Sequence, residues 1–347
     1  MSIPERSLHG EAAHYKGGVH PVADGSVAYL QPNGGLGEAN VGVVLGDDST
    51  LIIDTCWDHK QARRMLDAIG PHIKDRPIST VINTHSNGDH WWGNALMPAD
   101  AQIITSKASL DAMNTETPFA LGCARAALKV AASLPLPGMA GRSAREGYHE
   151  FKPFDFFGVR RRYPDTTFRG QTEITVGGRK LELLEVGPAH TPGDLMVFDH
   201  EAGVVFGGDI LFIEQTPIMW EGPARNWIHA IEAIERFSPE GIVPGHGPLT
   251  TIEQVANLRT YFEWVEAGAK SHRDAGTPAA DAALIMVQSE EFAGSPWAKW
   301  GRPEILAVTL ATEYQHLAGK HKPPNQIQMV GMMSSVRTLG EKLGGHG

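Results

Sequence analysis

The segment Thr84-His85-Ser86-Asn87-Gly88-Asp89-His90 follows a short apolar run, residues 80–83, that is typical of a buried strand. It places three ligand-type side chains and an amide within six positions, at a strand end where functional sites are commonly built. These groups can converge only if the chain turns tightly, and Gly88 permits such a turn. Because imidazole nitrogen and carboxylate oxygen are zinc ligands, the segment predicts a metal site on a loop.

Three further polar residues stand in glycine-rich turns that follow apolar runs. They are His190 in GPAHTPGD, Asp209 in FGGDILF and His246 in VPGHGP. A single histidine in a turn is more often a hydrogen-bonded structural residue than a ligand. All the groups nevertheless share one context, in which an apolar run is followed by small residues, the polar side chain and a loop. A common origin at strand ends is what a shared metal cluster requires.

The rest of the chain is predicted to alternate between strands and helices. Strand-like runs separated by Gly, Asn and Asp turns cover residues 27–30, 41–45, 50–54 and 102–105. Hairpin signals cover residues 172–186, around Gly177-Gly178, and residues 196–206. Helical spacing of apolar residues covers residues 60–69, 120–133, 228–237 and 252–269. Two blocks of strands, each followed by helices, favour a sandwich of two sheets flanked by helices.

We expect the chain to consist of one main domain with three additions. Residues 1–25 are polar and predict an N-terminal arm, and residues 26–250 the main domain. An insertion at about 108–165 is marked by the Pro/Gly stretch LPLPGMAGR and the aromatic stretch FKPFDFFG. Residues 251–347 predict a helical C-terminal extension packed on the same domain.

Composition limits the partners that we expect. The chain has 347 residues, a formal net charge of -10 and no evident basic stripe, which argues against nucleic-acid binding. No run reaches the roughly 18 apolar residues that a membrane span needs. With only Cys56 and Cys123, the sequence suits a reducing compartment, so we expect a cytoplasmic protein that does not bind membranes.

The ordered ligand set resembles the metallo-β-lactamase superfamily, whose pattern is His-x-His-x-Asp-His followed by a His, an Asp and a His on separate loops. The resemblance spans about residues 25–250 and includes Asp54, which is similar to the family's structural aspartate at a strand end. It implies an α/β fold, the αββα sandwich, with the site at one edge of the two sheets. The insertion and the helical C-terminal extension are additions to that fold.

One residue departs from the family pattern, because Asn87 stands where the second histidine is expected. The resemblance implies two zinc ions, the first held by His85, residue 87 and His190. It places Asp89, His90 and His246 on the second ion, with Asp209 bridging. Asn87 could bind the metal, contact a metal-bound water or be purely structural. Asp89 and Asn87 are the candidate catalytic residues, and iron and manganese remain alternatives to zinc.

The implied activity is that of a zinc-dependent hydrolase, because zinc lowers the pKa of a bound water to about 7. An overall likeness to chlorothalonil hydrolytic dehalogenases makes hydrolytic dehalogenation of an electron-poor chlorinated aromatic our first hypothesis. Hydrolysis of a lactone, ester or thioester is the alternative hypothesis, and an iron-dependent redox reaction is a third. The remaining hypothesis is a binding module without catalytic activity.

Aromatic residues cluster in sequence just after the motif residues, which favours an apolar or aromatic small-molecule substrate. The expected pocket residues are Trp57, Trp91, Trp92, Phe212, Trp220 and Trp227. We expect the insertion and the Gly-rich loop 31–40 to roof this pocket. The arm and the C-terminal helices exceed what the core fold needs, so we expect them to build a homodimer interface.

The ligand set predicts that the purified protein holds up to two zinc ions per chain and that chelation abolishes its activity. His90→Ala or His246→Ala should each lose the second metal and most activity, because each removes an imidazole ligand. Asn87→Ala should be milder if Asn87 does not bind the metal directly. Elemental analysis paired with activity measurements tests this, and full activity in metal-free protein would contradict it.

Overall fold

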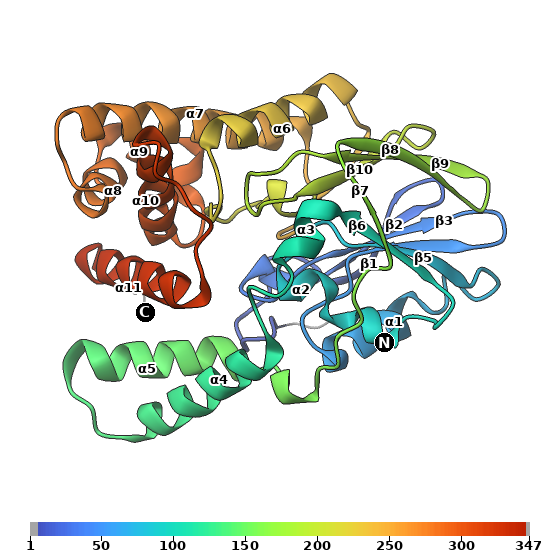
Figure 1. Ribbon diagram of the computed structural model, residues 1–347, viewed down its shortest axis with the longest axis horizontal. Helices are drawn as coiled ribbons and strands as arrows, with labels where there is room; N and C mark the ends of the chain where they lie inside the picture. Colours follow the sequence, from blue (N-terminus) through green and yellow to red (C-terminus); the bar gives the residue numbers. More distant parts are fainter. Residues whose placement is uncertain (1–5, 345–347) are drawn as a thin grey trace.

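The computed structural model describes residues 6–344 and consists of four layers, a helix, two sheets and a second layer of helices (Figure 1). The first sheet has seven strands in sequence order. Its strands are antiparallel from β1 to β4 and parallel from β4 to β7. The strands are β1 Gly18–Ala23, β2 Ser26–Leu30, β3 Val41–Leu45, β4 Thr50–Ile53, β5 Ile78–Ile82, β6 Gln102–Ser106 and β7 Thr166–Phe168.

The second sheet has five strands in the order β12-β11-β10-β9-β8. Only β11 and β12 are parallel, and the expected hairpins at residues 172–186 and 196–206 are both present. The strands are β8 Gln171–Val176, β9 Arg179–Glu185, β10 Leu195–Asp199, β11 Val204–Phe206 and β12 Gly241–Val243.

Helices cover both outer faces of the sandwich and continue beyond it at the C-terminus (Figure 1). None of those in the described residues is long and apolar enough to cross a membrane. The first six are α1 His59–Ile69, α2 Gly88–Trp91, α3 Lys107–Ala112, α4 Pro118–Ser133, α5 Gly138–Phe151 and α6 Ala224–Phe237. The C-terminal helices are α7 Ile252–Asp274, α8 Ala279–Val287, α9 Glu290–Ala293, α10 Leu306–Leu317 and α11 Gln326–Lys342.

Three apolar clusters hold the layers together. Between the sheets, side chains such as Leu51 and Ile53 pack against Val197 and Phe206. Outside the first sheet, α1 buries Ala62, Met65 and Ile69 against β3, β4 and β5. Outside the second sheet, α6 and α7 pack on β10 and extend the core into the C-terminal helices. The expected αββα sandwich with a helical C-terminal region is therefore confirmed.

Two boundaries differ from the sequence expectation. Residues 18–23 were expected within an arm, but they form β1 and pair with β2 at the edge of the first sheet. The Pro/Gly stretch in the insertion interrupts the helical structure only at residues 134–137, after which Gly138–Phe151 forms α5. Gly141 has no room for a Cβ, which would lie 2.0 Å from the Leu136 carbonyl oxygen, so this glycine serves close packing instead of ending the helix.

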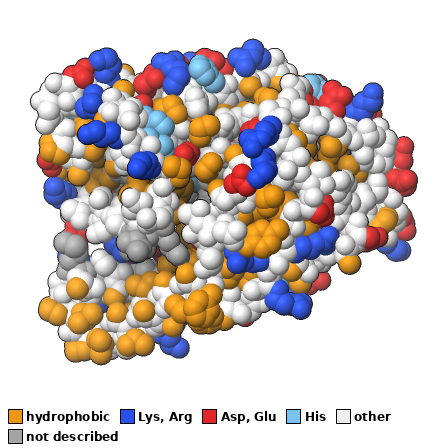
Figure 2. Space-filling view, viewed as in Figure 1, with side chains coloured by type: hydrophobic (Ala, Val, Ile, Leu, Met, Phe, Trp, Pro, Cys, Tyr) orange, Lys and Arg blue, Asp and Glu red, His pale blue; other side chains and the backbone are white. Residues whose placement is uncertain are grey.

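The hairpin of α4 and α5 projects from the sandwich and carries an exposed apolar surface. Phe119, Val130 and Leu134 are 72%, 62% and 48% exposed, and all three lie on α4 or directly after it. Figure 2 shows hydrophobic side chains gathered over this hairpin, at the lower left of the view. Exposed apolar patches of this kind mark interaction surfaces in soluble proteins.

An aromatic cluster joins the motif segment to the insertion. Trp57, Trp91 and Trp92 pack with Phe154 and Phe156, and all five side chains are at most 3% exposed. The ring centroids of Trp57 and Phe154 are 4.7 Å apart, and those of Trp57 and Phe156 are 5.0 Å apart. The cluster therefore positions the segment that carries the ligands, in addition to burying apolar surface.

This burial predicts a large stability difference between two tryptophans. Trp92→Ala should lower the free energy of unfolding by about 3–5 kcal/mol, because it empties a fully buried site. Trp220→Ala is the matched control and should cost less, because Trp220 is only partly buried. Urea unfolding followed by circular dichroism measures both. Equal losses would mean that Trp92 is not a core residue.

Candidate metal centre

The ligand segment follows the end of β5 and continues into the short helix α2, which contains Asp89 and His90. The sequence predicted a loop here, whereas the structure forms one helical turn with Asn87 as its N-cap residue. Gly88 is required for a reason other than a tight turn. A Cβ on Gly88 would lie 2.5 Å from Cε2 of Trp92, so glycine lets the buried indole pack against the backbone.

The remaining ligand candidates come from loops at the same edge of the sandwich. Asp209 follows β11, His246 follows β12, and His190 lies in the connection between β9 and β10. Two groups of side chains converge, with the ligand atoms of each group within 4.8 Å of one another. The first group is His85, His190 and Asp209, and the second is Asp89, His90 and His246.

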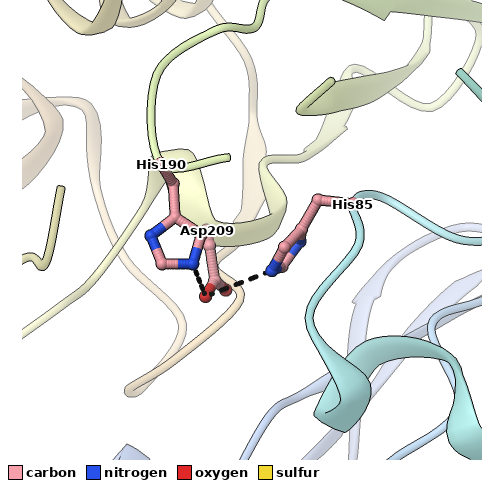
Figure 3. Close-up of side chains that lie close together, drawn as sticks. All are labelled: His85, His190 and Asp209. Carbon is pink, nitrogen blue, oxygen red and sulfur yellow. Dashed lines mark ion pairs between the residues drawn. The ribbon is translucent and has the colours of Figure 1, made fainter. Parts of the chain in front are cut away.

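Asp209 lies between the two groups. Its Oδ2 is 3.4 Å from His190 Nε2, 3.6 Å from His85 Nε2 and 3.5 Å from His246 Nε2. Its Oδ1 is 3.3 Å from His90 Nε2. Figure 3 shows the His85 and His190 rings directed at this carboxylate from two sides. A carboxylate in this position can bridge two ions, which is the role that the sequence resemblance implies for it.

The donor set fits divalent metal ions. His85 Nε2, His90 Nε2 and Asp209 Oδ1 are buried and have no hydrogen-bond partner among the described residues. Buried polar atoms are costly unless something satisfies them, and three such atoms here face one small volume. Imidazole nitrogen with carboxylate oxygen is the donor chemistry of zinc sites and of other transition metals.

The second ring nitrogen of each histidine fixes the direction of the first. His190 Nδ1 lies 2.7 Å from the Ile218 carbonyl oxygen, and His246 Nδ1 lies 3.1 Å from that of Gly34. A carbonyl oxygen only accepts, so both Nδ1–H groups donate, and these contacts hold each ring with its Nε2 directed at the centre. The Gly34 contact also shows what loop 31–40 contributes, because this loop orients His246.

Asp54 performs the same function for the ligand segment. Its Oδ2 lies 2.8 Å from His90 Nδ1, and its two oxygens accept hydrogen bonds from the Thr84 backbone N–H and Oγ1. Thr84 Oγ1 lies 3.0 Å from His85 Nδ1, so one carboxylate orients two ligands. Asp54 has a φ of 66°, an unfavourable backbone conformation of the kind that is concentrated at functional sites.

Burial and charge together set the protonation of the centre. Burial and the neighbouring His90 lower the pKa of His85 well below its usual range, and burial also lowers the pKa of His190. Burial would lower the pKa of His90 as well, but the surrounding carboxylates of Asp209, Asp54 and Asp89 raise it well above its usual range. The centre thus concentrates negative charge that a divalent cation compensates.

Asn87 reaches the first group of ligands. Its Oδ1 lies 2.8 Å from His190 Nε2, the ring atom that faces Asp209. The amide oxygen is therefore placed where the second motif histidine would present its nitrogen. Because Asn87 stands in place of a histidine, the first group of ligands has one imidazole fewer than the family pattern. The amide oxygen, a neutral metal-binding group, takes its place.

The expected pocket residues divide into two sets. Trp57, Trp91, Trp92 and Trp227 are at most 3% exposed and belong to the apolar core, and none of them lines either of the two cavities described below. Their positions next to ligands in sequence reflect the packing that supports the centre. Phe212 stacks on the His246 ring with centroids 5.2 Å apart, and Trp220 lines the cavity beside the centre.

The cavity beside the centre is narrow, about 50 Å³, and most of its walls were not predicted. Ser86 and Asn87 form the metal side, and Glu116 accepts a hydrogen bond from the Gly88 backbone N–H at 2.9 Å. No sequence signal marked Glu116, because it belongs to the insertion and has no motif around it. The other lining residues are Ala112, Thr115, Thr191, Pro192, Trp220, Glu221, Pro323, Pro324 and Met329.

The chain belongs to the metallo-β-lactamase superfamily, whose family model matches residues 34–246. The match contains all the ligand candidates, from His85 to His246. The two groups of candidate ligands thus lie within the matched residues, at one edge of the two-sheet sandwich.

Among curated relatives, the chain is similar to the 2,4-dinitroanisole O-demethylase subunit alpha of Nocardioides sp. (strain JS1661). The two are 22% identical over 209 residues, which are 58% of this chain and 50% of that protein. It is also similar to the linear primary-alkylsulfatase of Pseudomonas sp. (strain ATCC 19151), with 21% identity over 61% of this chain and 42% of that protein. The chain thus spans about half the length, or less, of these relatives.

A solved structure with a similar fold is the stereoselective inverting sec-alkylsulfatase Pisa1 from Pseudomonas sp. The TM-score is 0.66 at 17% sequence identity, with 88% of this chain and 51% of that chain covered. At this identity the likeness shows the fold alone. Because 88% of this chain is covered, the likeness extends beyond the core domain.

The contacts of Asp54 predict a loss of metal affinity without loss of a ligand. Asp54→Asn should weaken metal binding about 10- to 100-fold, because His90 loses the carboxylate that orients it. Asp199→Asn is the control, a buried carboxylate in β10 that bonds Arg179 instead of a ligand. Competition of both variants with a zinc-chelating dye measures the affinity, and equal affinities would contradict an orienting role for Asp54.

Proposed function

We propose that the protein is a metal-dependent hydrolase that cleaves a small molecule, uncharged at the bond that is attacked and with a substantial apolar part. The observation that carries this proposal is the pair of ligand groups joined by Asp209 beside a cavity. Two divalent ions, with zinc preferred, would activate water and polarise the bond that is attacked.

Asp89 and Asn87 are the residues to which we assign roles at the reacting atoms. Asp89 is the most exposed carboxylate of the centre, at 13%, and its Oδ2 lies 3.5 Å from His246 Nε2. We propose that it orients the attacking water and accepts its proton, and its exposure and its position beside His246 support this role. Asn87 lines the cavity as well as reaching His190, so its amide would hold the metal and face the substrate.

The cavity walls support an uncharged group at the centre. Glu116 and Glu221 line this cavity, and none of its described lining residues is Lys or Arg. A sulfate ester placed here would face carboxylates and would find no cation in these walls, which is unfavourable electrostatically. The similarity to alkylsulfatases therefore supports the fold and the metal chemistry more than it supports their substrate.

We favour cleavage of a carbon–oxygen bond in an ester, a lactone or an activated aryl ether. The relative named for O-demethylation of 2,4-dinitroanisole supports the ether, because that substrate is a neutral, electron-poor arene. Hydrolytic dehalogenation needs the same kind of arene, but none of the relatives above is named for it. Thioester hydrolysis and iron-dependent redox chemistry at these ligands are weaker alternatives.

We also keep the expectation of a cytoplasmic homodimer as part of the proposal. Cys56 and Cys123 are both free, as in a reducing compartment. The exposed apolar surface of the α4–α5 hairpin is a further candidate for the interface, beside the N-terminal arm and the C-terminal helices.

A substrate panel on zinc-loaded protein tests the proposal. It compares 2,4-dinitroanisole, a phenyl ester, a γ-lactone, dodecyl sulfate and a chlorinated aromatic nitrile, with metal content assayed in the same samples. We expect turnover of the ester, the lactone or the ether, and at least tenfold lower kcat/KM for dodecyl sulfate, because its charge faces carboxylates.

Oxygen-18 water in a single turnover identifies the nucleophile. The label should enter product in the first turnover, because the attacking oxygen comes from water and not from a side chain. If dodecyl sulfate is the preferred substrate, the proposal that the cleaved group is uncharged is overturned. If chloride release is the only reaction detected, dehalogenation is favoured. Activity that is retained without any metal would overturn the hydrolase proposal itself.

A further inference from the structure

A second and larger cavity, about 290 Å³, lies next to the narrow cavity at the metal centre. It is formed by α10, α11 and the segment between them. Trp220 and Pro324 line both cavities, so the two are neighbours across these side chains. The remaining described lining residues are Thr312, Gln315, His321, Lys322, Gln328, Gly331, Met332 and Ser335.

The two cavities differ in the charged side chains that line them. Glu116 and Glu221 line the narrow cavity, whereas the larger one has Lys322 and no Asp or Glu among its described lining residues. Most of the other polar groups of the larger cavity can donate hydrogen bonds, because they are hydroxyl, amide or imidazole groups. An elongated molecule that occupied both cavities would therefore have an uncharged end at the metals and an anionic end in the larger cavity.

Buried donors of the larger cavity have no partner in the described part of the chain. Thr312 is 1% exposed, and its Oγ1 makes no hydrogen bond there. His321 is 11% exposed, and its Nε2 lies 3.2 Å from Glu221 Oε1 but outside hydrogen-bond geometry. Buried polar groups are normally satisfied, so these side chains indicate a ligand that accepts hydrogen bonds.

The backbone connects this cavity to the centre. The Trp220 N–H donates to the carbonyl oxygen of His190 at 3.2 Å, and His190 Nδ1 lies against the Ile218 carbonyl oxygen. The segment 218–220, which includes the Trp220 shared by both cavities, is thus hydrogen-bonded to His190, a candidate metal ligand. A molecule that spans both cavities would have its reacting bond at the metal centre and would pass beside Trp220, with its far end near Thr312 and Lys322.

We propose that the larger cavity is a subsite for an anionic group of the carboxylate class, at the end of the substrate remote from the bond that is cleaved. This proposal rests on the hydrolase function proposed above. It narrows the substrate to molecules with a neutral ester or ether bond, an apolar spacer and a distal carboxylate. Thr312 and Lys322 are specificity-determining residues of this subsite, and neither is assigned to the metal centre.

Three methyl esters that differ only at the far end test the subsite. Monomethyl adipate ends in a carboxylate, dimethyl adipate in a neutral ester and methyl 6-aminohexanoate in an ammonium group. Each is titrated calorimetrically into zinc-loaded protein and is also assayed as a substrate. We expect Kd and KM for monomethyl adipate to be about tenfold lower than for the other two, because one charge-assisted contact is worth about that factor.

Two variants assign the preference to the cavity. Lys322→Gln and Thr312→Val should each raise KM for monomethyl adipate about fivefold, with kcat and the values for dimethyl adipate unchanged. Lys320→Gln is the matched control, because Lys320 is exposed on the same segment and does not line the cavity. Lys322 is exposed, so its variant keeps the test valid even if Thr312→Val folds poorly.

The calorimetric and kinetic results separate the two proposals. Preferential binding of monomethyl adipate that depends on Lys322, without turnover of any ester or ether, would overturn the hydrolase proposal and support the subsite. Turnover with equal KM and Kd for the three esters would overturn the subsite. No binding of monomethyl adipate, or equal effects of Lys322→Gln and Lys320→Gln, would also overturn the subsite.

Discussion

The carboxylate of Asp54 is the interaction on which the metal centre depends. It joins the end of β4 to Thr84 at the end of β5 and holds the His90 ring, so strand pairing and ligand geometry are fixed by one group. Burial raises the pKa of this carboxyl, and the His90 contact opposes that rise. A buried carboxyl is stable there only with such partners, which means that the fold and the ligand set stabilise each other.

Charge is distributed unevenly around this point. Asp54, Asp89 and Asp209 surround His90, and Glu116 and Glu221 extend the negative side into the narrow cavity. Divalent ions compensate the charge at the ligands, but they leave the cavity wall acidic. Lys322 lies on the far side of Trp220. Among the described residues that line the two cavities, it is the only Lys or Arg.

The ligands could be predicted because each has a local signature, an apolar strand followed by small residues and a polar side chain. The sandwich could be predicted from alternation and turn residues, since both are local as well. The tryptophans could not be assigned from sequence, because adjacency to His90 does not fix whether Trp91 and Trp92 face the core or a cavity. Glu116 and the walls from α10 and α11 come from distant parts of the chain, and only tertiary packing brings them together.

The exposed connection between α4 and α5 separates the candidate ligands into two halves of the chain. Residues 134–137 are all exposed at the tip of the hairpin, where a backbone break is tolerated best. A break there leaves His85, Asp89 and His90 on one fragment and His190, Asp209 and His246 on the other. Each fragment then holds one or two of the three side chains of each group, so binding of a metal ion by a complete group would drive their association. A chain divided at this point would be a two-fragment metal sensor, in which association of the fragments would report the concentration of the free ion.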